Sequence, residues 1–235
     1  MKEKINNINR LLVQYFGVPY RPKKLPNPID ALIATILSQN TNDRNSYQAY
    51  NNLKNKYKSI DEISLTPRSE IEKVIKVAGL GKQKSAAIKN LLSRLKKTSG
   101  KLNLQYIKKM TDDEILIELT SMKGIGVKTA SCVLLFSLDR NICPVDTHVH
   151  RTLSRIGIVK SKTPDKTFEQ IKGNLQDGIA HQFHTNLIKL GREICKPTKP
   201  FCSICPLLNL CKFRNKNLNN VDKKSSNSFL LLDSI

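Results

Sequence analysis

Apolar residues recur along almost the whole chain at the spacing of α-helices. Near the N-terminus they fall at steps of three and four residues, which places them on one face of a helix. These residues are Ile5, Ile8, Leu11, Leu12, Tyr15 and Phe16. Gly17 and Pro19 follow and are expected to end this helix. Because no segment shows the alternation of a half-buried strand, the pattern predicts an all-α fold.

Further helices are predicted by the same spacing together with signals at the helix ends. Asn27 and Pro28 are expected to supply an N-cap and a first-turn proline. Thr111 and Glu114 have the spacing of a capping box, and Pro164 marks another helix start. The expected helices cover residues 28–36, 44–57, 67–78, 83–97, 112–121, 127–137, 147–156, 164–175 and 180–194.

The charge of the chain indicates a polyanionic partner. Among 235 residues there are 40 Lys and Arg against 19 Asp and Glu, a formal net charge of +21. Such an excess attracts nucleic acids through phosphate neutralisation. An anionic membrane surface and simple solvation of the lysines are the alternatives. The longest apolar run falls far short of the ~20 residues that span a bilayer, so we expect no membrane segment.

A short C-terminal loop carries the residues best suited to hold an inorganic centre. Its four cysteines have the spacing C-x6-C-x2-C-x5-C. They are Cys195, Cys202, Cys205 and Cys211. Thiolates in this number bind a 4Fe–4S cluster or a zinc ion. Zinc sites usually join two tight pairs, and here only Cys202 and Cys205 form one, so the spacing favours the cluster; zinc, disulfides and idle thiols stay open.

The redox compartment and the other two cysteines follow from simpler considerations. The chain starts Met-Lys-Glu-Lys-Ile without an apolar signal segment. We therefore expect a cytoplasmic protein, associated with the nucleoid through DNA and not secreted, in which disulfides are disfavoured. Cys132 and Cys143 lie far from the loop in sequence and are expected to be buried as small hydrophobic residues.

A glycine-rich turn between two predicted helices has the pattern of an anion site. Gly124 and Gly126 flank Ile125, which lets the backbone turn tightly and present N–H groups outward. The next helix starts at this turn and adds positive partial charge. A DNA phosphate could approach such a helix–hairpin–helix without any reading of base sequence. Lys123 would add a phosphate contact; a plain tight turn is the alternative.

Two residues acquire a catalytic interpretation only in context. Lys128, beyond the turn, taken alone would be a phosphate contact or a solvated side chain. Asp146 precedes a predicted helix, and an N-cap is its simplest interpretation. Lys84 lies in a Gly-Leu-Gly-Lys-Gln-Lys stretch that mimics the hairpin weakly. We favour Lys128 because only it is paired with the downstream aspartate motif.

Together these motifs resemble the endonuclease III family of helix–hairpin–helix DNA glycosylases. The resemblance covers about residues 25–212 and is carried by Gly124–Ala130, Val145–His148 and the cysteine loop, whose spacing is the family's. It implies two helical lobes with a DNA-binding cleft between them. The six-helix lobe with the hairpin would span 22–134. The cluster lobe would combine 1–21 with 135–214, and 215–235 would be a polar, flexible tail.

The resemblance also implies a mechanism. A damaged nucleotide is flipped out of double-stranded DNA. Lys128 attacks C1′ of its sugar, and β-elimination from the resulting Schiff base cuts the strand 3′ to the lesion. Asp146 stabilises the oxocarbenium-like charge and helps to activate the amine. The implied substrates are oxidised pyrimidines, the implied cofactor is the 4Fe–4S cluster, and the protein is expected to act as a monomer.

Three further residues are implied to contact the opened duplex. The family places a glutamine in the gap left by the flipped nucleotide, where this sequence has Asn40, with Gln39 one position earlier. Leu80 matches the family's apolar wedge between bases. Which of Gln39 and Asn40 fills the gap stays open, and Leu80 packed inward as a turn residue is the alternative to the wedge.

Other functions stay open on the same scaffold. A mismatch- or alkylation-specific glycosylase would share the fold, but the mismatch adenine glycosylases usually lack the lysine found here as Lys128. A non-catalytic DNA-binding iron–sulfur protein would need neither Lys128 nor Asp146. A zinc-bearing nucleic-acid adaptor is the most distant alternative.

Overall fold

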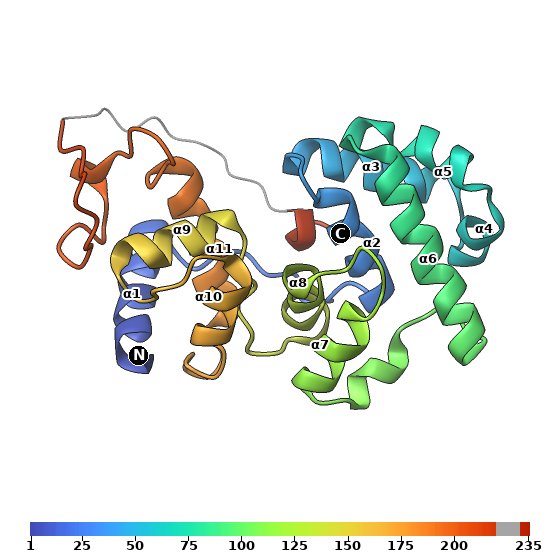
Figure 1. Ribbon diagram of the computed structural model, residues 1–235, viewed down its shortest axis with the longest axis horizontal. Coiled ribbons are helices and arrows are strands. Elements are labelled where there is room, and N and C mark those ends of the chain that lie inside the picture. The colour runs from blue at the N-terminus through green and yellow to red at the C-terminus, as the bar shows by residue number, and fades with distance from the viewer. Residues whose placement is uncertain (220–230) are drawn as a thin grey trace. The chain divides into compact units, whose positions relative to one another are not determined.

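Helices make up the regular structure of the described residues, 1–219 and 231–235, in a computed structural model (Figure 1). No strand occurs within these ranges, which confirms the predicted all-α class. The helices are α1 (Lys2–Phe16), α2 (Pro28–Ser38), α3 (Asp43–Lys56), α4 (Ile60–Leu65), α5 (Arg68–Val74), α6 (Gly81–Ser99), α7 (Asp112–Thr120), α8 (Val127–Leu138), α9 (Thr147–Ile156), α10 (Pro164–Ile171) and α11 (Ala180–Glu193), with 3-10 helices η1 (Lys76–Ala78), η2 (Gln105–Lys109), η3 (Cys202–Ile204) and η4 (Leu231–Asp233).

The described chain divides into two compact units, each built from segments distant in sequence. Unit 1 combines Met1–Arg21 with the segment that starts at Arg140 and carries the cysteine loop. Unit 2 combines Pro22–Asp139 with the C-terminal residues 231–235. The lobe boundary that we expected at 134 falls inside α8, which continues to Leu138 and stays with unit 2.

Helix α2 forms the centre of unit 2. Its residues from Pro28 to Leu37 are buried with the sole exception of Asp30, because apolar side chains occupy nearly every side of the helix. It packs against α3, α6 and α8. The candidate site residues of this unit lie at or next to the ends of these helices and not in their middles.

In unit 1, helix α11 packs against α1 and α9, and α9 also contacts α10. The approach of α9 and α11 is close, since a Cβ on Gly191 would lie 2.8 Å from the Cβ of His148. Gly191 is therefore required by packing, not by a turn. The apolar face predicted for α1 is the one that is buried, with Ile5, Ile8 and Leu12 in the core.

Helix ends explain where the structure departs from the predicted elements. The capping box at Thr111 is confirmed, with the Thr111 side chain accepting the N–H of Glu114. Asn27 stands at the N-cap of α2 but makes no capping hydrogen bond, because its Oδ1 accepts from Gln105 Nε2 instead. Helix α4, capped by Ser59, was not predicted, since its six residues are too few to establish a period.

The end of the chain differs from the polar, flexible tail that we predicted for 215–235. Leu231 and Leu232 are 2% and 9% exposed, and η4 packs against α2 and α3. The last residues therefore dock on unit 2, while residues 220–230 of the predicted tail lie outside the described residues. Cys132 and Cys143 are buried as expected. Within the described ranges, none of the helices combines the length and apolarity that a bilayer crossing requires.

Candidate functional site

The turn between α7 and α8 is held to the core by its apolar residues. Met122 and Ile125 are 4% and 5% exposed, while Lys123, Gly124 and Gly126 are exposed. The N–H of Ile125 donates to the carbonyl oxygen of Met122 at 3.1 Å. This N–H is therefore used within the turn and is not among the outward-facing N–H groups of the hairpin, while the side chain of Ile125 anchors the turn to the core.

The two glycines of the hairpin serve different purposes. Gly124 has φ +91°, and a Cβ there would lie 3.0 Å from the Cβ of Ala87 on α6. A side chain at residue 124 would therefore crowd α6 as well as adopt a backbone conformation that favours glycine. Gly126 has φ −96°, a conformation open to any residue, and a Cβ there would meet nothing within 4 Å. Nothing in the fold of the described residues requires glycine at 126.

Gly126 is the N-cap of α8 and leaves the start of that helix open. No side chain caps it. The first N–H groups of a helix have no partner within the helix, so those of α8 remain available to an anion. Lys128 is the second residue of α8 and is partly exposed. A cationic side chain and free N–H groups therefore share one helix start.

Gln39, at the end of α2, braces the hairpin. Its Nε2 lies 3.2 Å from the carbonyl oxygen of Gly124 and 3.3 Å from the hydroxyl of Thr129. Its neighbour Asn40 is exposed and has φ +50°. The structure thus separates two residues that sequence could not rank: Gln39 is engaged within unit 2, and Asn40 is presented outward. The contact was missed because it joins positions about ninety residues apart.

Leu80 forms a second exposed tip in unit 2. It has φ +50° and is 46% exposed, so the alternative that it packs inward is wrong. Left-handed backbone at a leucine costs free energy, on the order of 1–2 kcal/mol. Asn40 and Leu80 thus share a left-handed backbone conformation and an outward position, although asparagine adopts this conformation more readily than leucine does.

Lys84 is not presented to solvent, unlike the hairpin lysine that it resembles in sequence. It is 2% exposed, and its Nζ donates to the carbonyl oxygens of Leu37 and Ala78, both at 2.8 Å. Desolvation lowers the pKa of Lys84 to about 8. Burial of the amine removes Lys84 as an alternative to Lys128. No sequence signal marks it, because its partners are main-chain atoms of other elements.

Asp146 caps α9 in unit 1, as the simplest interpretation of the sequence predicted. Its Oδ1 accepts the N–H of Val149 at 2.8 Å. A carboxylate has further acceptor capacity, so this bond does not exhaust the group. The carbonyl oxygen of Pro144, two residues earlier, lies 2.9 Å from Nδ1 of the buried His184 and fixes the approach to α9. Lys128 belongs to unit 2, so the two predicted catalytic residues come from different units.

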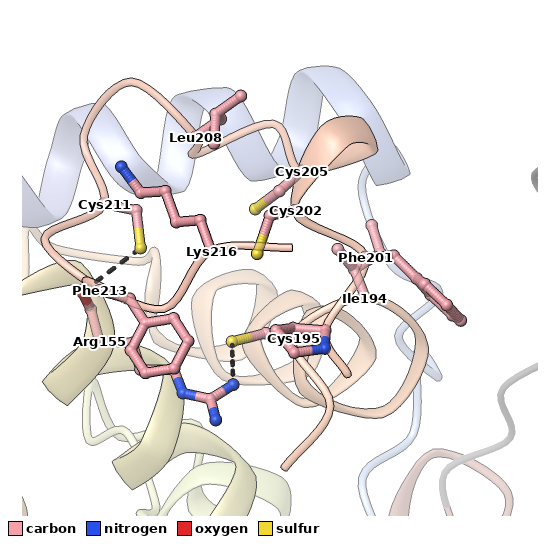
Figure 2. A pocket seen from close by; sticks show the side chains of 11 residues that line it. Arg155, Ile194, Cys195, Phe201, Cys202, Cys205, Leu208, Cys211, Phe213 and Lys216 are labelled. Atoms are coloured by element: carbon pink, nitrogen blue, oxygen red, sulfur yellow. Dashed lines mark hydrogen bonds between the residues drawn. The ribbon is translucent and has the colours of Figure 1, made fainter. Parts of the chain in front are cut away.

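The four cysteines of the loop line one hollow in unit 1 (Figure 2). The hollow is partly open to solvent. Its lining also includes Arg155, Phe201, Leu208 and Phe213. Figure 2 shows the sulfur atoms turned towards this shared space. Residues separated by up to sixteen positions in the sequence thus converge on one small volume.

The four thiols together supply the donor set of a thiolate-bound centre. All four are free. Burial, together with the charges of the neighbouring cysteines, raises the pKa of Cys205 to about 12. Among residues 1–219 and 231–235, no three His, Cys, Asp or Glu side chains group closely enough for a single metal ion.

Two arginines of α9 organise the loop around the hollow. Arg155 donates to the carbonyl oxygens of Lys196 and Pro197 at 2.7 and 2.8 Å, and it stacks on Phe213 with its guanidinium carbon 4.2 Å from the ring centre. Its Nη1 lies 3.5 Å from Cys195 Sγ. Arg151 donates to the carbonyl oxygen of Cys195 at 3.0 Å. Sequence gave no signal for these contacts, which depend on α9 packing beside the loop.

Replacement of Gly124 by alanine is expected to lower the free energy of unfolding by about 1–3 kcal/mol, because it combines positive φ with a crowded Cβ. Gly126→Ser is the matched control: its φ suits serine, its Cβ meets open space, and serine is a favourable N-cap. That variant should stay within about 0.5 kcal/mol of the unchanged protein. Denaturant unfolding measures both, and equal stability of the two variants would contradict this account of the hairpin.

Comparisons with known proteins agree with this geometry. Residues 33–177 match the family described as HhH-GPD superfamily base excision DNA repair protein. Endonuclease III of Thermotoga maritima is 34% identical over 89% of this chain and 92% of its own length. Endonuclease III of Sulfolobus acidocaldarius is 34% identical over 84% and 87%. A solved non-covalent endonuclease III–DNA complex aligns with a TM-score of 0.75 at 26% identity, covering 90% of this chain and 95% of the other. The chain therefore belongs to the HhH-GPD superfamily of base excision DNA repair proteins.

Proposed function

We propose that this protein is a DNA N-glycosylase with an associated lyase activity, which removes oxidised pyrimidines and then cuts the strand 3′ to the abasic site. The observation that carries the proposal is the open N-terminus of α8, where a side-chain-free N-cap stands two positions before Lys128. Phosphate binding and a nucleophile are thereby combined on one helix start. The similarity to proteins named endonuclease III supports the same reading.

Double-stranded DNA is the proposed partner. The free N–H groups at the start of α8 would bind a backbone phosphate, with Gly126 leaving room for its approach and Lys123 adding charge. Gly124 and Ile125 would act indirectly by holding the turn in shape. A net charge of +21 favours this association at any sequence. A solved relative in complex with DNA supports the assignment.

Lys128 is proposed as the nucleophile. A damaged base is reachable only when its nucleotide leaves the stack. The neutral amine bonds to C1′ as the bond from C1′ to the base breaks, and the base departs with the electron pair and gains a proton. Opening of the sugar ring leaves an iminium at C1′. Loss of a proton from C2′ then expels the 3′ phosphate, which cuts the strand.

Asp146 is proposed as the electrostatic partner of this step. Positive charge develops on the sugar as the base leaves, and a carboxylate beside it lowers the barrier. The same carboxylate can accept the proton that Lys128 must lose. The capping bond to Val149 fixes one oxygen and leaves the other for this role.

Asn40 and Leu80 are proposed to enter the opened duplex. Both stand at exposed tips with positive φ. Asn40 would fill the gap left by the flipped nucleotide and Leu80 would wedge between bases. Gln39 is proposed as a brace and not as the gap-filling residue, since its amide is already bonded to the hairpin.

The cysteine loop is proposed to hold a 4Fe–4S cluster through Cys195, Cys202, Cys205 and Cys211. The donor set fits, since four free thiols with the C-x6-C-x2-C-x5-C spacing line one hollow. When bound, the cluster cross-links the loop and supplies no step of base removal. The loop's own role is to present nearby cations such as Lys212 and Arg214 to DNA.

The lesion class is the finest part of the proposal. The test measures release of oxidised pyrimidines, mismatched bases and alkylated bases from duplexes that are otherwise identical. Base release is scored separately from nicking, which distinguishes the proposed specificity from those of other glycosylases. Preference for a mismatched or alkylated base would replace the proposed substrate and leave the lyase assignment intact.

Lys128→Ala is expected to abolish covalent capture of abasic duplex DNA by borohydride, because the captured species is the reduced imine between this side chain and C1′. Lys123→Ala is the matched control, since it removes an exposed lysine from the same hairpin and keeps the nucleophile. With protein in excess, the control should reach the unmodified protein's yield. Full capture by Lys128→Ala would assign the nucleophile to another amine, and no capture by the unmodified protein would exclude a lyase.

Asp146→Asn separates the two roles given to this residue. Asparagine is as good an N-cap as aspartate, so the free energy of unfolding should change by less than about 0.5 kcal/mol. The charge is lost, however, and single-turnover base release should slow by about 100-fold or more. Denaturant unfolding and rapid-quench kinetics measure the two effects. A stable variant that releases the base at the normal rate would reduce Asp146 to a helix cap.

A further inference from the structure

The two exposed tips of unit 2, Asn40 and Leu80, are connected by hydrogen bonds from one buried side chain. Asn40 follows the end of α2, and Leu80 follows η1. Both have φ +50°, and neither is a glycine. Exposed residues held in an unfavourable backbone conformation need surrounding bonds that over-determine them. The relevant bonds come from Lys84.

The Lys84 ammonium joins the chain segments that lead to these tips. Its Nζ lies 2.8 Å from the carbonyl oxygen of Leu37, three residues before Asn40, and 2.8 Å from that of Ala78, two residues before Leu80. Leu37 is in the last turn of α2, and Ala78 ends η1. Carbonyls at helix ends lack partners within the helix and carry negative partial charge, which suits a cation.

Burial of this cation costs free energy, and no ion pair among the described residues offsets that cost. Lys84 is 2% exposed, and the ion pairs of the described residues do not include it. A lysine in such surroundings is retained only where its hydrogen bonds matter. An apolar residue would leave both carbonyls unpaired, whereas one ammonium has three donors and can hold both.

We propose that Lys84 is a positioning residue that fixes the spacing between Asn40 and Leu80, so that both tips enter the duplex together when the nucleotide is flipped out. This inference rests on the proposed function, which makes both tips DNA-entering. The end of α2 also carries Gln39, bonded to the hairpin. Lys84 and Gln39 thus tie three proposed DNA-contacting elements, Asn40, Leu80 and the hairpin, to one helix end.

The test compares nicking of an abasic site in duplex DNA with nicking of the same site in a single strand. A single strand has no stack to open, so it needs the nucleophile but not the two tips. Lys84→Met keeps the stem of the side chain and removes its donors. We expect its duplex-to-single-strand rate ratio to fall by about tenfold or more, because small displacements of positioning groups slow catalysis strongly. A merely structural defect lowers both rates together and leaves the ratio unchanged.

Lys89→Met is the matched control. Lys89 lies on the same helix and also donates to two main-chain carbonyls, those of Ser64 and Thr66, at the C-terminal end of α4, which carries none of the site residues. Its ratio should equal that of the unmodified protein. If Lys84→Met does not fold, Lys84→Gln, which retains one amide donor group, is measured against the same criterion.

The outcomes separate this inference from the function on which it rests. Absence of nicking by the unmodified protein would overturn the proposed function and this inference with it. Normal nicking together with an unchanged ratio in the folded Lys84 variant would overturn the positioning role alone. If the duplex-to-single-strand ratio also fell in Lys89→Met, the positioning role of Lys84 would be overturned, since the effect would then not be specific to the two tips.

Discussion

The open N-terminus of α8 is the feature on which the rest of the site depends. A helix start leaves N–H groups that must find partners, and most helices of this chain with a suitable residue satisfy one of them by a side-chain cap, as at Thr111 and Asp146. At α8 the cap position is Gly126, which supplies none. The unmet N–H groups lie beside Lys128, so an anion bound there would bring its attached sugar towards an amine.

The surrounding structure holds this helix start in place. Gly124 lets the turn pack on Ala87, and Ile125 inserts into the core. Gln39 then ties the turn to the end of α2, whose last carbonyls are held by Lys84. In unit 1, Arg151 and Arg155 perform the comparable task for the cysteine loop by binding its main chain. Both candidate sites are therefore supported by cationic or amide side chains that bond to carbonyls.

Local signals in the sequence were enough for most of the fold. The apolar spacing in α1, the helix predicted at 147–156 and the Thr111 capping box each depend on residues near one another in the chain, and each was predicted correctly. The Gly-Ile-Gly motif likewise located the hairpin. Short elements such as α4 failed because six residues carry too little periodicity.

Long-range bonds account for what could not be predicted. The ranking of Gln39 against Asn40 depends on a bond to Thr129, and the burial of Lys84 depends on two main-chain carbonyls of other elements. The docking of Leu231 on α2 and α3 joins the two ends of the sequence of unit 2. For Gln39 and Lys84 the residue type favoured a solvent-exposed interpretation, and for Leu231 the polar composition of the preceding segment did; in each case packing decided otherwise.

Gly126→Asp tests the phosphate-binding role of α8 most directly. Aspartate is a favourable N-cap, and its charge suits a helix start, so the free energy of unfolding should stay the same or rise by up to about 1 kcal/mol. The same carboxylate would occupy the N–H groups and repel phosphate. Affinity for undamaged duplex DNA should therefore fall by about tenfold or more, with a shallower dependence on salt. A stable variant that binds duplex DNA with the affinity and salt dependence of the unmodified protein would contradict the account.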